Sequence, residues 1–369
     1  MRRNIRMRLK IGVVGLNHGY SLARAIRSSN TLELAGVCTR SPDSHLRQAA
    51  ELGVPLFAHL DSMLAELDLD GVVLAAATNQ LVTLAKRCLE HNVSILIEKP
   101  AGISVSEVLA LKQVAARTTA RVIVGYYRRL ARQVVVLKEL LAANVIGDVV
   151  GVSCKWVIKK PPGYFQGWKA SRASGGGCLM INVIHDLDLL QNLFGPVDTV
   201  AALESPSGKP DDLEHCVALT LRFSNGTLGS VFLCDQSPSP YSYENTVAAV
   251  SKFPTYCVDS HHFFGTNGSL AFPSFTLYSS RSPSHSWLDT LDSRVVSDAN
   301  DTIDDPIALQ MERFSQVLRG QREPHATLDD AIRNLAVVEA IRRCLARSTP
   351  ESIRYPLDTD ELLRPLKSR

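Results

Sequence analysis

The sequence predicts an α/β protein: a doubly wound parallel sheet in an N-terminal domain, then an α+β domain with a mainly antiparallel, open sheet. Short apolar runs alternate with amphipathic stretches up to residue 125, as expected for βαβ units. Between residues 197 and 280 the pattern is instead rich in short strands and hairpin-like turns. We therefore predict a first domain over residues 1–125 and a second over residues 126–369.

The expected first domain alternates strands with helices along the chain. Each strand candidate is a short apolar run, and each stretch between two runs repeats its apolar residues at helical spacing. The expected strands are Leu9–Val14, Leu32–Cys38, Gly71–Ala76, Ser94–Glu98 and Arg121–Gly125. The expected helices lie near residues 19–28, 42–52, 60–67, 79–91 and 104–117. Parallel strands joined through helices of this length form right-handed crossovers.

The expected second domain begins with a helix at 131–143 and strand-like residues at 147–158. A loop rich in Lys, Pro, Gly and aromatic residues follows over Lys159–Ser174. A helix is then expected from about residue 178 to residue 194, where Gly195-Pro196 stops it. The pattern thus predicts a polar, aromatic loop directly before a helix.

The last third of the chain is expected to form hairpins, an irregular excursion and two helices. Phe223–Thr227 and Thr266–Ser269 each contain Asn-Gly, which tolerates positive φ and predicts a hairpin turn. Residues 281–304 are polar and are expected to form an irregular surface excursion. One closing helix starts at Asp305-Pro306 and ends at Gly320, and the other runs from Thr327 to about Arg347.

Composition and charge exclude several classes of protein. Of 369 residues, 45% are hydrophobic and 21% are charged, which is the usage of an ordinary folded chain. A formal net charge of +3 indicates neither a nucleic-acid partner nor an acidic tail, and no apolar run is long enough to cross a membrane. Eight scattered cysteines without a C-x-x-C pair predict neither a disulfide framework nor a zinc site. Because the apolar run after the basic start is too short for a secretion signal, we expect a cytoplasmic protein.

A glycine turn follows the first expected strand. The usual dinucleotide fingerprint, G-x-G-x-x-G, lets the backbone and the helix dipole approach a pyrophosphate. Here Gly15 is the first glycine, but Asn17 and Tyr20 occupy the second and third positions. Gly19 can supply part of the missing freedom, and asparagine tolerates left-handed geometry. The turn therefore predicts a dinucleotide site, although a plain strand-to-helix turn is the alternative interpretation.

The end of the second expected strand favours NADP over NAD. An NAD site normally has Asp or Glu there to bind the ribose 2′-hydroxyl. This chain has the neutral Thr39 followed by Arg40 and Ser41, and a guanidinium can bind a 2′-phosphate. The alternative interpretation of Arg40 is an exposed side chain in a loop.

Three short motifs carry a family resemblance: Glu98-Lys99-Pro100, Ser174–Gly177 and His185–Asp188. By their order and spacing, with Asp305-Pro306 and the closing helices, the chain resembles the Gfo/Idh/MocA oxidoreductases (the glucose–fructose oxidoreductase and inositol dehydrogenase family) over nearly its whole length. The resemblance implies a Rossmann domain, a substrate domain, and hydride transfer between nicotinamide and the secondary alcohol or ketone of a sugar or cyclitol. It also implies a homo-oligomer, a dimer or a tetramer, formed through the second-domain sheet.

Two residues match the catalytic positions of that family. Lys99 matches the lysine that hydrogen-bonds the reacting oxygen, a role that suits an ammonium at the carboxyl end of a strand. His185 matches the acid/base histidine, and an imidazole can exchange a hydroxyl proton near neutral pH. The alternative interpretations are a surface lysine and a core histidine. The acidic residue that the family usually has four positions before the histidine is Ile181 here, with Asn182 near the same helix face.

The resemblance also assigns binding residues. The expected cofactor contacts are Gly15, Leu16, Asn17, His18, Thr39, Arg40, Ser41, Ala76, Ala77, Thr78, Glu98, Lys99 and Arg128. The expected substrate contacts are Lys99, Arg129, Tyr164, Trp168, Lys169, Asn182 and His185. The cationic, aromatic loop around Tyr164 suits a polyol or sugar that bears carboxylate or phosphate, or else it is a solvated basic loop. No metal site is predicted, because the adjacent His261 and His262 point to opposite faces of a strand.

The leading hypothesis is an NADP(H)-dependent oxidoreductase that acts on a hydroxylated small molecule. A second hypothesis is a family member that binds NAD(P) as a sensor or partner-binding protein but has lost turnover, which Ile181, Asn17 and Tyr20 motivate. A third is a lyase or epimerase that uses bound nicotinamide transiently. Cofactor titration and a substrate screen distinguish the three.

Overall fold

The computed structural model describes residues 7–206, 212–247, 253–280, 282, 286–301 and 304–356. Contacts divide the chain into two compact units. The first contains the residues up to Tyr127 together with Ala173–Gly175 and Pro306–Ile332, and the second contains Arg128–Arg172, Gly176–Asp305 and the residues from Arg333 onward. A late segment of the chain therefore returns to the first unit. In the described part of the chain, no helix is both long and apolar enough to span a membrane.

The first unit is built on a six-stranded sheet with the order β3-β2-β1-β4-β5-β6, in which every neighbouring pair is parallel. Its strands are β1 (Leu9–Val14), β2 (Leu32–Cys38), β3 (Leu56–Phe57), β4 (Gly71–Leu74), β5 (Ser94–Ile97) and β6 (Val122–Val124). This is the strand order of a Rossmann fold, which reverses between β1 and β4 and binds ligands at the carboxyl ends of the strands there. The predicted parallel sheet is confirmed.

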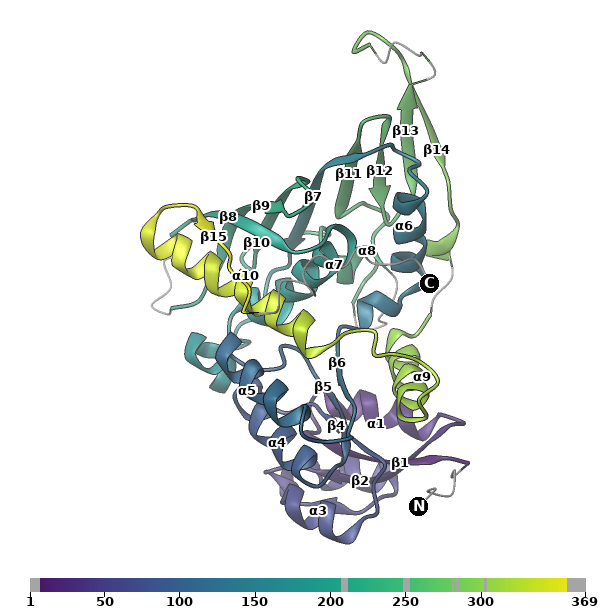
Figure 1. The fold of residues 1–369 in the computed structure, drawn as a ribbon, viewed down its shortest axis with the longest axis vertical. Helices are drawn as coiled ribbons and strands as arrows, with labels where there is room; N and C mark the ends of the chain where they lie inside the picture. Colours follow the sequence, from purple (N-terminus) through teal and green to yellow (C-terminus); the bar gives the residue numbers. More distant parts are fainter. Residues whose placement is uncertain are drawn as a thin grey trace. The chain divides into compact units, whose positions relative to one another are not determined.

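Helices pack on both faces of this sheet (Figure 1). They are α1 (Gly19–Arg27), α2 (Leu46–Leu52), α3 (Leu60–Glu66), α4 (Thr78–Glu90), α5 (Val105–Ala115) and α9 (Pro306–Leu318). Figure 1 shows α4 and α5 on one side of the strands and α1 with α9 on the other. Met311 and Phe314 of α9 share a buried core with Leu22 and Ile26 of α1, so this late helix closes the first unit.

The second unit contains a nine-stranded sheet with the order β14-β13-β12-β11-β7-β10-β9-β8-β15. The strands are β7 (Val149–Val157), β8 (Val197–Glu204), β9 (Cys216–Phe223), β10 (Leu228–Cys234), β11 (His261–Gly265), β12 (Gly268–Phe272), β13 (Thr276–Ser280), β14 (Leu291–Val295) and β15 (Glu351–Ser352). Strands β7 and β10 pair in parallel, whereas the other pairs among the described strands are antiparallel. The predicted mainly antiparallel sheet is therefore confirmed.

The helices of the remaining chain are α6 (Arg132–Ala142), α7 (Ile184–Phe194), α8 (Tyr243–Thr246) and α10 (Leu328–Arg347). Short 3-10 turns lie at Pro42–His45, Tyr127–Leu130, Gly167–Ala170, Arg172–Ser174 and Ala299–Asp301. Burial alternates strictly along β9, so one face of the large sheet packs on the core while the other is open.

Three strands and the start of one helix differ from the sequence prediction, and the short helix α8 lies in a stretch expected to be rich in strands. Strand β14 lies inside the stretch expected to be irregular, because its largely exposed residues pair with β13 through backbone and show no apolar alternation. Strands β3 and β15 have two residues each, too few to give a period. The helix expected over 178–194 starts with a π-helical turn at Leu179–Val183 before α7.

Both predicted hairpins form, but for different local reasons. Gly226, between β9 and β10, adopts a φ of 91°, as the Asn-Gly turn predicted. The turn between β11 and β12 forms without positive φ at Asn267 or Gly268. Backbone pairing of the two strands is therefore sufficient there, and the left-handed conformation is not used.

Candidate functional site

The loop between β1 and α1 packs tightly against the loop that follows β4. Gly15 has a φ of 88°, and a Cβ atom there would lie 2.6 Å from the carbonyl oxygen of Ala75. The Gly15 N–H donates to the carbonyl of Cys38 at 2.8 Å, at the end of β2. The three loops at the strand-order reversal thus meet at this glycine, and a side chain would separate them.

The N-terminus of α1 provides the features that a pyrophosphate needs. His18 precedes the helix without a side-chain cap, and the first turn contains no acidic residue, so the helix N–H groups and dipole are available to an anion. Asn17 and His18 are exposed, whereas Leu16 is buried. Asn17 does not adopt positive φ, so its tolerance of left-handed geometry is not used. These residues fit the phosphates of a dinucleotide.

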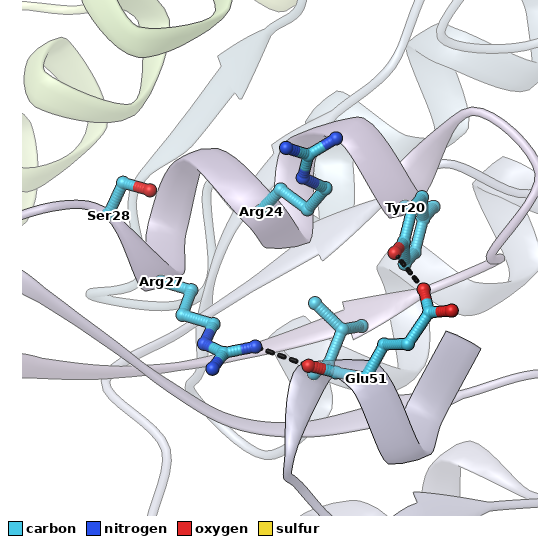
Figure 2. Close-up of a pocket in the computed structure, with 6 residues that line it drawn as sticks. Tyr20, Arg24, Arg27, Ser28 and Glu51 are labelled. Carbon is cyan, nitrogen blue, oxygen red and sulfur yellow. Dashed lines mark hydrogen bonds between the residues drawn. The ribbon is translucent and has the colours of Figure 1, made fainter. Parts of the chain in front are cut away.

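Gly19 and Tyr20 explain how the loop works without the usual third glycine. A Cβ atom on Gly19 would lie 3.1 Å from side-chain carbons of Val13 and Ala75, so Gly19 permits the close helix-to-strand packing that the third glycine normally provides. Tyr20 points to the outer side of α1, where its hydroxyl donates to Glu51 at 2.6 Å (Figure 2). This hydrogen bond, with one from Arg47, lowers the pKa of Glu51. Tyr20 is therefore accommodated outside the phosphate loop.

A pocket of about 450 Å³ lies beside this tyrosine (Figure 2). It is formed by helices α1 and α2, and its lining residues are Tyr20, Arg24, Arg27, Ser28, Glu51 and Leu52. Arg27 donates to the backbone carbonyl of Glu51 across it. None of the predicted catalytic or binding residues lines this pocket, so we do not assign it to the candidate site.

Arg40, which follows the end of β2, has no ionic partner among the described residues. Thr39 is buried, and its N–H donates to the carbonyl of Phe57 in the short strand β3 at 3.0 Å. Its hydroxyl accepts from the N–H of Ser41 at 3.4 Å. Arg40 and Ser41 are exposed, and Arg40 forms no ion pair with any described residue. The guanidinium is therefore available to a ligand at the carboxyl edge of the sheet.

The ends of β4 and β5 place a buried carboxylate beside Lys99. Ala76 and Ala77 are half-buried and Thr78 is buried at the start of α4. Lys99 is half-buried after β5, and the bond to Pro100 is cis.

The carboxylate of Glu98 is buried, and its Oε1 has no hydrogen-bond partner among the described residues. His18 Nε2 lies 3.9 Å from that oxygen, and a Cβ atom on Gly125 would lie 2.9 Å from it. The side-chain amide of Gln310 is also buried without a partner in the described residues, and its nitrogen would lie 3.1 Å from the same Cβ atom. Unsatisfied buried polar groups at the ligand edge of a Rossmann sheet are typical of a binding site.

In the second unit, His185 is nearly buried, with 5% of its surface exposed, in the first turn of α7. The π-helical turn at Leu179–Val183 immediately precedes it, and such turns occur frequently at functional sites. Ile181 and Asn182 are half-buried, and Asn182 Oδ1 has no hydrogen-bond partner in the described chain. Asn182 lies three residues before His185 in the sequence. The Oδ1 atom of Asn182 can accept a hydrogen bond from a ligand hydroxyl.

Arg128 is buried within a group of charged and aromatic side chains. It is 1% exposed, and its guanidinium donates to Asp186 Oδ1 and to Glu244 Oε1, each at 2.8 Å. Its guanidinium carbon lies 4.1 Å from the centre of the Tyr243 ring. Since the guanidinium is buried between two carboxylates, Arg128 forms a structural ion-pair group of the second unit, and its role as a cofactor contact stays a prediction.

Burial alone would raise the pKa of Asp186, but the Arg128 guanidinium and a hydrogen bond from His261 outweigh it and lower that pKa. Sequence reasoning missed Glu244 as the second partner of Arg128. It lies in α8, whose four residues are too few to show a helical period.

Arg129 is also engaged by a carboxylate. Its Nε and Nη2 donate to the two oxygens of Asp188 at 2.8 and 2.6 Å, in a bidentate pair. Asn334 of α10 donates to the same carboxylate at 2.9 Å. Asp188 therefore anchors Arg129 and α10, and the side chain of Arg129 keeps 11% exposure.

One group of potential metal ligands occurs among the described residues: Cys154, Asp186 and His261. His261 Nε2 lies 3.2 Å from Cys154 Sγ and 3.5 Å from Asp186 Oδ1. Burial and the nearby Asp186 carboxylate raise the pKa of the Cys154 thiol well above its usual range, and Arg128 already neutralises that carboxylate. The group is therefore better explained as a hydrogen-bonded network than as a cation site.

The loop before the helix that carries His185 contains three of the predicted substrate contacts. Tyr164, Trp168 and Lys169 are all half-buried, and the Lys169 ammonium lies 4.5 Å from the centre of the Tyr164 ring. The loop packs on the glycine turn that follows it: a Cβ atom on Gly176 would lie 2.3 Å from the Lys169 carbonyl oxygen. The glycines thus permit close packing of backbone on backbone before the helix.

Comparisons with known proteins agree with this architecture. A family model described as "Oxidoreductase family, NAD-binding Rossmann fold" matches residues 9–126, and one described as "GFO/IDH/MocA C-terminal domain" matches residues 134–271. The chain is 26% identical over 349 residues to the rhizopine catabolism protein MocA of Rhizobium meliloti, covering 92% of this chain and 96% of that protein. It is 23% identical over 250 residues to the inositol 2-dehydrogenase of Rhizobium meliloti, covering 65% and 72%.

A solved structure has the same fold. The WlbA dehydrogenase from Bordetella pertussis, in complex with NADH and UDP-GlcNAcA, is similar with a TM-score of 0.75 and 21% sequence identity. The similarity covers 95% of this chain and 100% of that chain.

The buried ion pair predicts a large loss of stability on substitution. We expect Asp186→Asn to lower the free energy of unfolding by about 3 kcal/mol, because Arg128 stays buried with one carboxylate fewer. Since the folded pKa of Asp186 is lowered, its stabilising effect is present above the pKa of the unfolded carboxyl and disappears as the pH falls through the folded value. Urea unfolding at neutral pH measures the loss.

Asp198→Asn is the matched control, because Asp198 pairs with Arg222 at 2.9 Å on the surface, where about 0.5 kcal/mol is expected. Equal losses in the two variants would contradict the importance of the buried pair.

Proposed function

Because the chain belongs to the Gfo/Idh/MocA family of oxidoreductases, we propose that it transfers a hydride between a nicotinamide dinucleotide and the secondary alcohol or ketone of a sugar, cyclitol or related polyhydroxylated molecule. The observation that carries this proposal is the Glu98-Lys99 pair at the carboxyl end of β5, where a buried carboxylate oxygen lacks a partner among the described residues. The relatives named for rhizopine catabolism and for inositol 2-dehydrogenation support a cyclitol or a similar ring.

The cofactor is proposed to lie along the carboxyl edge of the six-stranded sheet. Gly15, Leu16, Asn17 and His18 would hold the pyrophosphate through backbone N–H groups at the uncapped start of α1. Arg40 and Ser41, with Thr39 behind them, would receive a ribose 2′-phosphate, which favours NADP over NAD. Residues Ala76–Thr78 and the Glu98 carboxylate would border the nicotinamide end. When bound, the nicotinamide supplies or accepts the hydride.

Two side chains are proposed to perform the proton and charge chemistry. Lys99 donates a hydrogen bond to the reacting oxygen and stabilises the negative charge that develops there. His185 takes the hydroxyl proton in oxidation and returns it in reduction, as an imidazole can near neutral pH. Asn182 binds a substrate hydroxyl but cannot act as a base, so the proton transfer depends on His185. The Tyr164, Trp168 and Lys169 loop supplies further substrate contacts, whereas Arg129 reaches the substrate only with its remaining exposed edge.

We propose a functional boundary near residue 125, with the cofactor bound by residues 1–125 and the substrate mainly by residues 126–369. We also propose that the protein is a homo-oligomer, a dimer or a tetramer. Cross-strand register puts five exposed apolar residues on the open face of the large sheet, with exposed fractions from 41 to 75%: Leu203, Phe232, Leu228, Phe264 and Tyr278. An apolar patch of this kind is typical of a surface that a second copy covers.

The cofactor proposal predicts a selective effect of Arg40. We expect Arg40→Gln to weaken NADPH binding about tenfold and to leave NADH binding unchanged, because it removes a charge-assisted contact to the 2′-phosphate. Fluorescence titration of both cofactors measures this. Arg47→Gln, which removes an exposed arginine of α2, is the control and should bind NADPH as the wild type does. A clear preference of the wild type for NADH would contradict the assignment.

The catalytic proposal predicts that chemistry is lost while cofactor binding is kept. We expect Lys99→Met and His185→Gln each to lower kcat about 100-fold or more on the best substrate from a sugar and cyclitol panel, because each removes a group that acts on the reacting oxygen or its proton. NAD(P)H absorbance follows turnover, and Lys86→Met in α4 is the charge control. If the wild type bound cofactor yet turned over no member of the panel, the sensor hypothesis would replace this one.

The open sheet face predicts how the assembly can be dissociated. We expect the double variant L228E/F232E to elute as a monomer, because two carboxylates would be buried without partners in an interface between copies. Size-exclusion chromatography with light scattering measures the mass. The control Leu46→Glu changes an exposed leucine of α2 in the first unit and should keep the wild-type mass. A monomeric wild type would refute the assembly.

A further inference from the structure

Two lysines contact one aromatic ring in the loop between β7 and the helix that carries His185. The Lys160 ammonium lies 4.4 Å from the centre of the Tyr164 ring, and the Lys169 ammonium lies 4.5 Å from the same centre. Lys160 also lies 4.9 Å from the centre of the Trp156 ring. Two lysines that are nine positions apart in the chain thus contact the same tyrosine ring.

Neither lysine has a carboxylate partner in the part of the chain that the structure describes. Both are half-buried, although lysines are usually exposed unless they are paired. Burial lowers the pKa of Lys160 and Lys169 adds to this, whereas Cys178, Glu244 and Asp235 counter the lowering only in part. Two like charges therefore contact the same ring in a half-buried loop, at a cost that a bound anion would offset.

The loop around these lysines is anchored at both ends. The Lys160 N–H donates to the carbonyl of Asp235 at 2.9 Å, directly after β10. The Lys169 carbonyl accepts from the Gly177 N–H at 3.3 Å, and Gly177 immediately precedes the segment that leads to His185. Both lysines are thus fixed to the elements that position the catalytic helix.

An ion-pair group holds the end of the same loop. Arg172 Nε lies 3.2 Å from the buried carboxylate of Glu214, which also accepts from Arg342 of α10 at 2.8 Å. Arg172 is therefore occupied, which leaves Lys160 and Lys169 as the cations of this loop that are both half-buried and unpaired among the described residues.

Tyr164, whose ring both cations contact, supplies a neutral donor. Burial raises the pKa of its phenol to about 12, so the hydroxyl keeps its proton at neutral pH. No hydrogen bond of this hydroxyl exists within the described residues. Trp156 is held in place by a hydrogen bond from its Nε1 to Glu244 at 3.2 Å. The group therefore combines two ammonium donors and a hydroxyl donor over an aromatic wall.

We propose that Lys160 and Lys169, with the Tyr164 hydroxyl, bind the carboxylate or phosphate group of an anionic polyhydroxylated substrate. This inference rests on the proposed function, because it assigns the substrate class of the same site. Two point charges on flexible stems suit a carboxylate or phosphate oxygen without a bidentate requirement. The substrate is thus a sugar or cyclitol acid or a phosphate ester, in preference to a neutral ring.

Inorganic phosphate is the probe for the anion site itself. Isothermal titration is carried out on protein saturated with NADPH, so that the dinucleotide phosphate positions are already filled. We expect saturable phosphate binding that weakens about tenfold in Lys160→Gln and in Lys169→Gln, because each removes one charged contact. Lys160→Arg keeps the charge and should keep the binding, and high salt should weaken wild-type binding. Lys159→Gln, at the exposed neighbouring position, is the matched control and should bind phosphate as the wild type does.

D-Glucuronate and D-glucose then test the extension to substrates. We expect the wild type to bind or turn over glucuronate better than glucose, and the K160Q/K169Q variant to lose this preference. The proposal would be overturned if the wild type showed no saturable phosphate binding, or if the double variant bound phosphate as the wild type does. It would also be overturned if the double variant lost binding or turnover of glucuronate and of glucose equally. A wild type that does not bind NADPH would contradict the proposed function instead, and a separate titration with NADPH measures this binding.

Discussion

The buried guanidinium of Arg128 organises the second unit. It pairs with Asp186 of α7 and Glu244 of α8, two carboxylates that would otherwise be buried without a guanidinium partner. Asp186 in turn contacts His261 of β11, which lies beside Cys154 of β7. Because one arginine connects two helices to two neighbouring strands, the orientation of α7 depends on this ion pair. His185 immediately precedes Asp186, so the same helix positions it.

The neighbouring pair of Arg129 and Asp188 extends this arrangement to α10 through Asn334. Consecutive arginines after the first unit therefore anchor two acidic residues that lie two positions apart on α7. Such residues diverge around a helix, so the two pairs hold different sides of α7. The two acidic residues that follow His185 on α7 therefore each have an arginine partner. Asn182, which precedes His185, keeps an oxygen without a hydrogen-bond partner among the described residues.

Much of the fold was predictable because its causes are local. The apolar runs of the parallel strands, the glycine turn and the caps of α9 and α10 act over a few residues and appear directly in the sequence. Strand β14 was not predictable, because its backbone pairs with β13 while its exposed side chains follow no pattern. The roles of Arg128 and Glu244 were not predictable either, since the two residues are 116 positions apart. The predicted catalytic pair Lys99 and His185, and the preference for NADP, stay predictions.

The sequence by itself determined the family, the two kinds of sheet and the edge at which a dinucleotide would bind, because these depend on periodicity, glycines and motif order. Only the tertiary structure decided which charged residues are available to a ligand. Arg128 and Arg129 meet carboxylates from distant segments, whereas Arg40, Lys160 and Lys169 meet none in the described chain. The physical reason is that the ionic state and access of a charged group depend on what folding brings within a few ångströms of it, and neighbours in sequence do not report this.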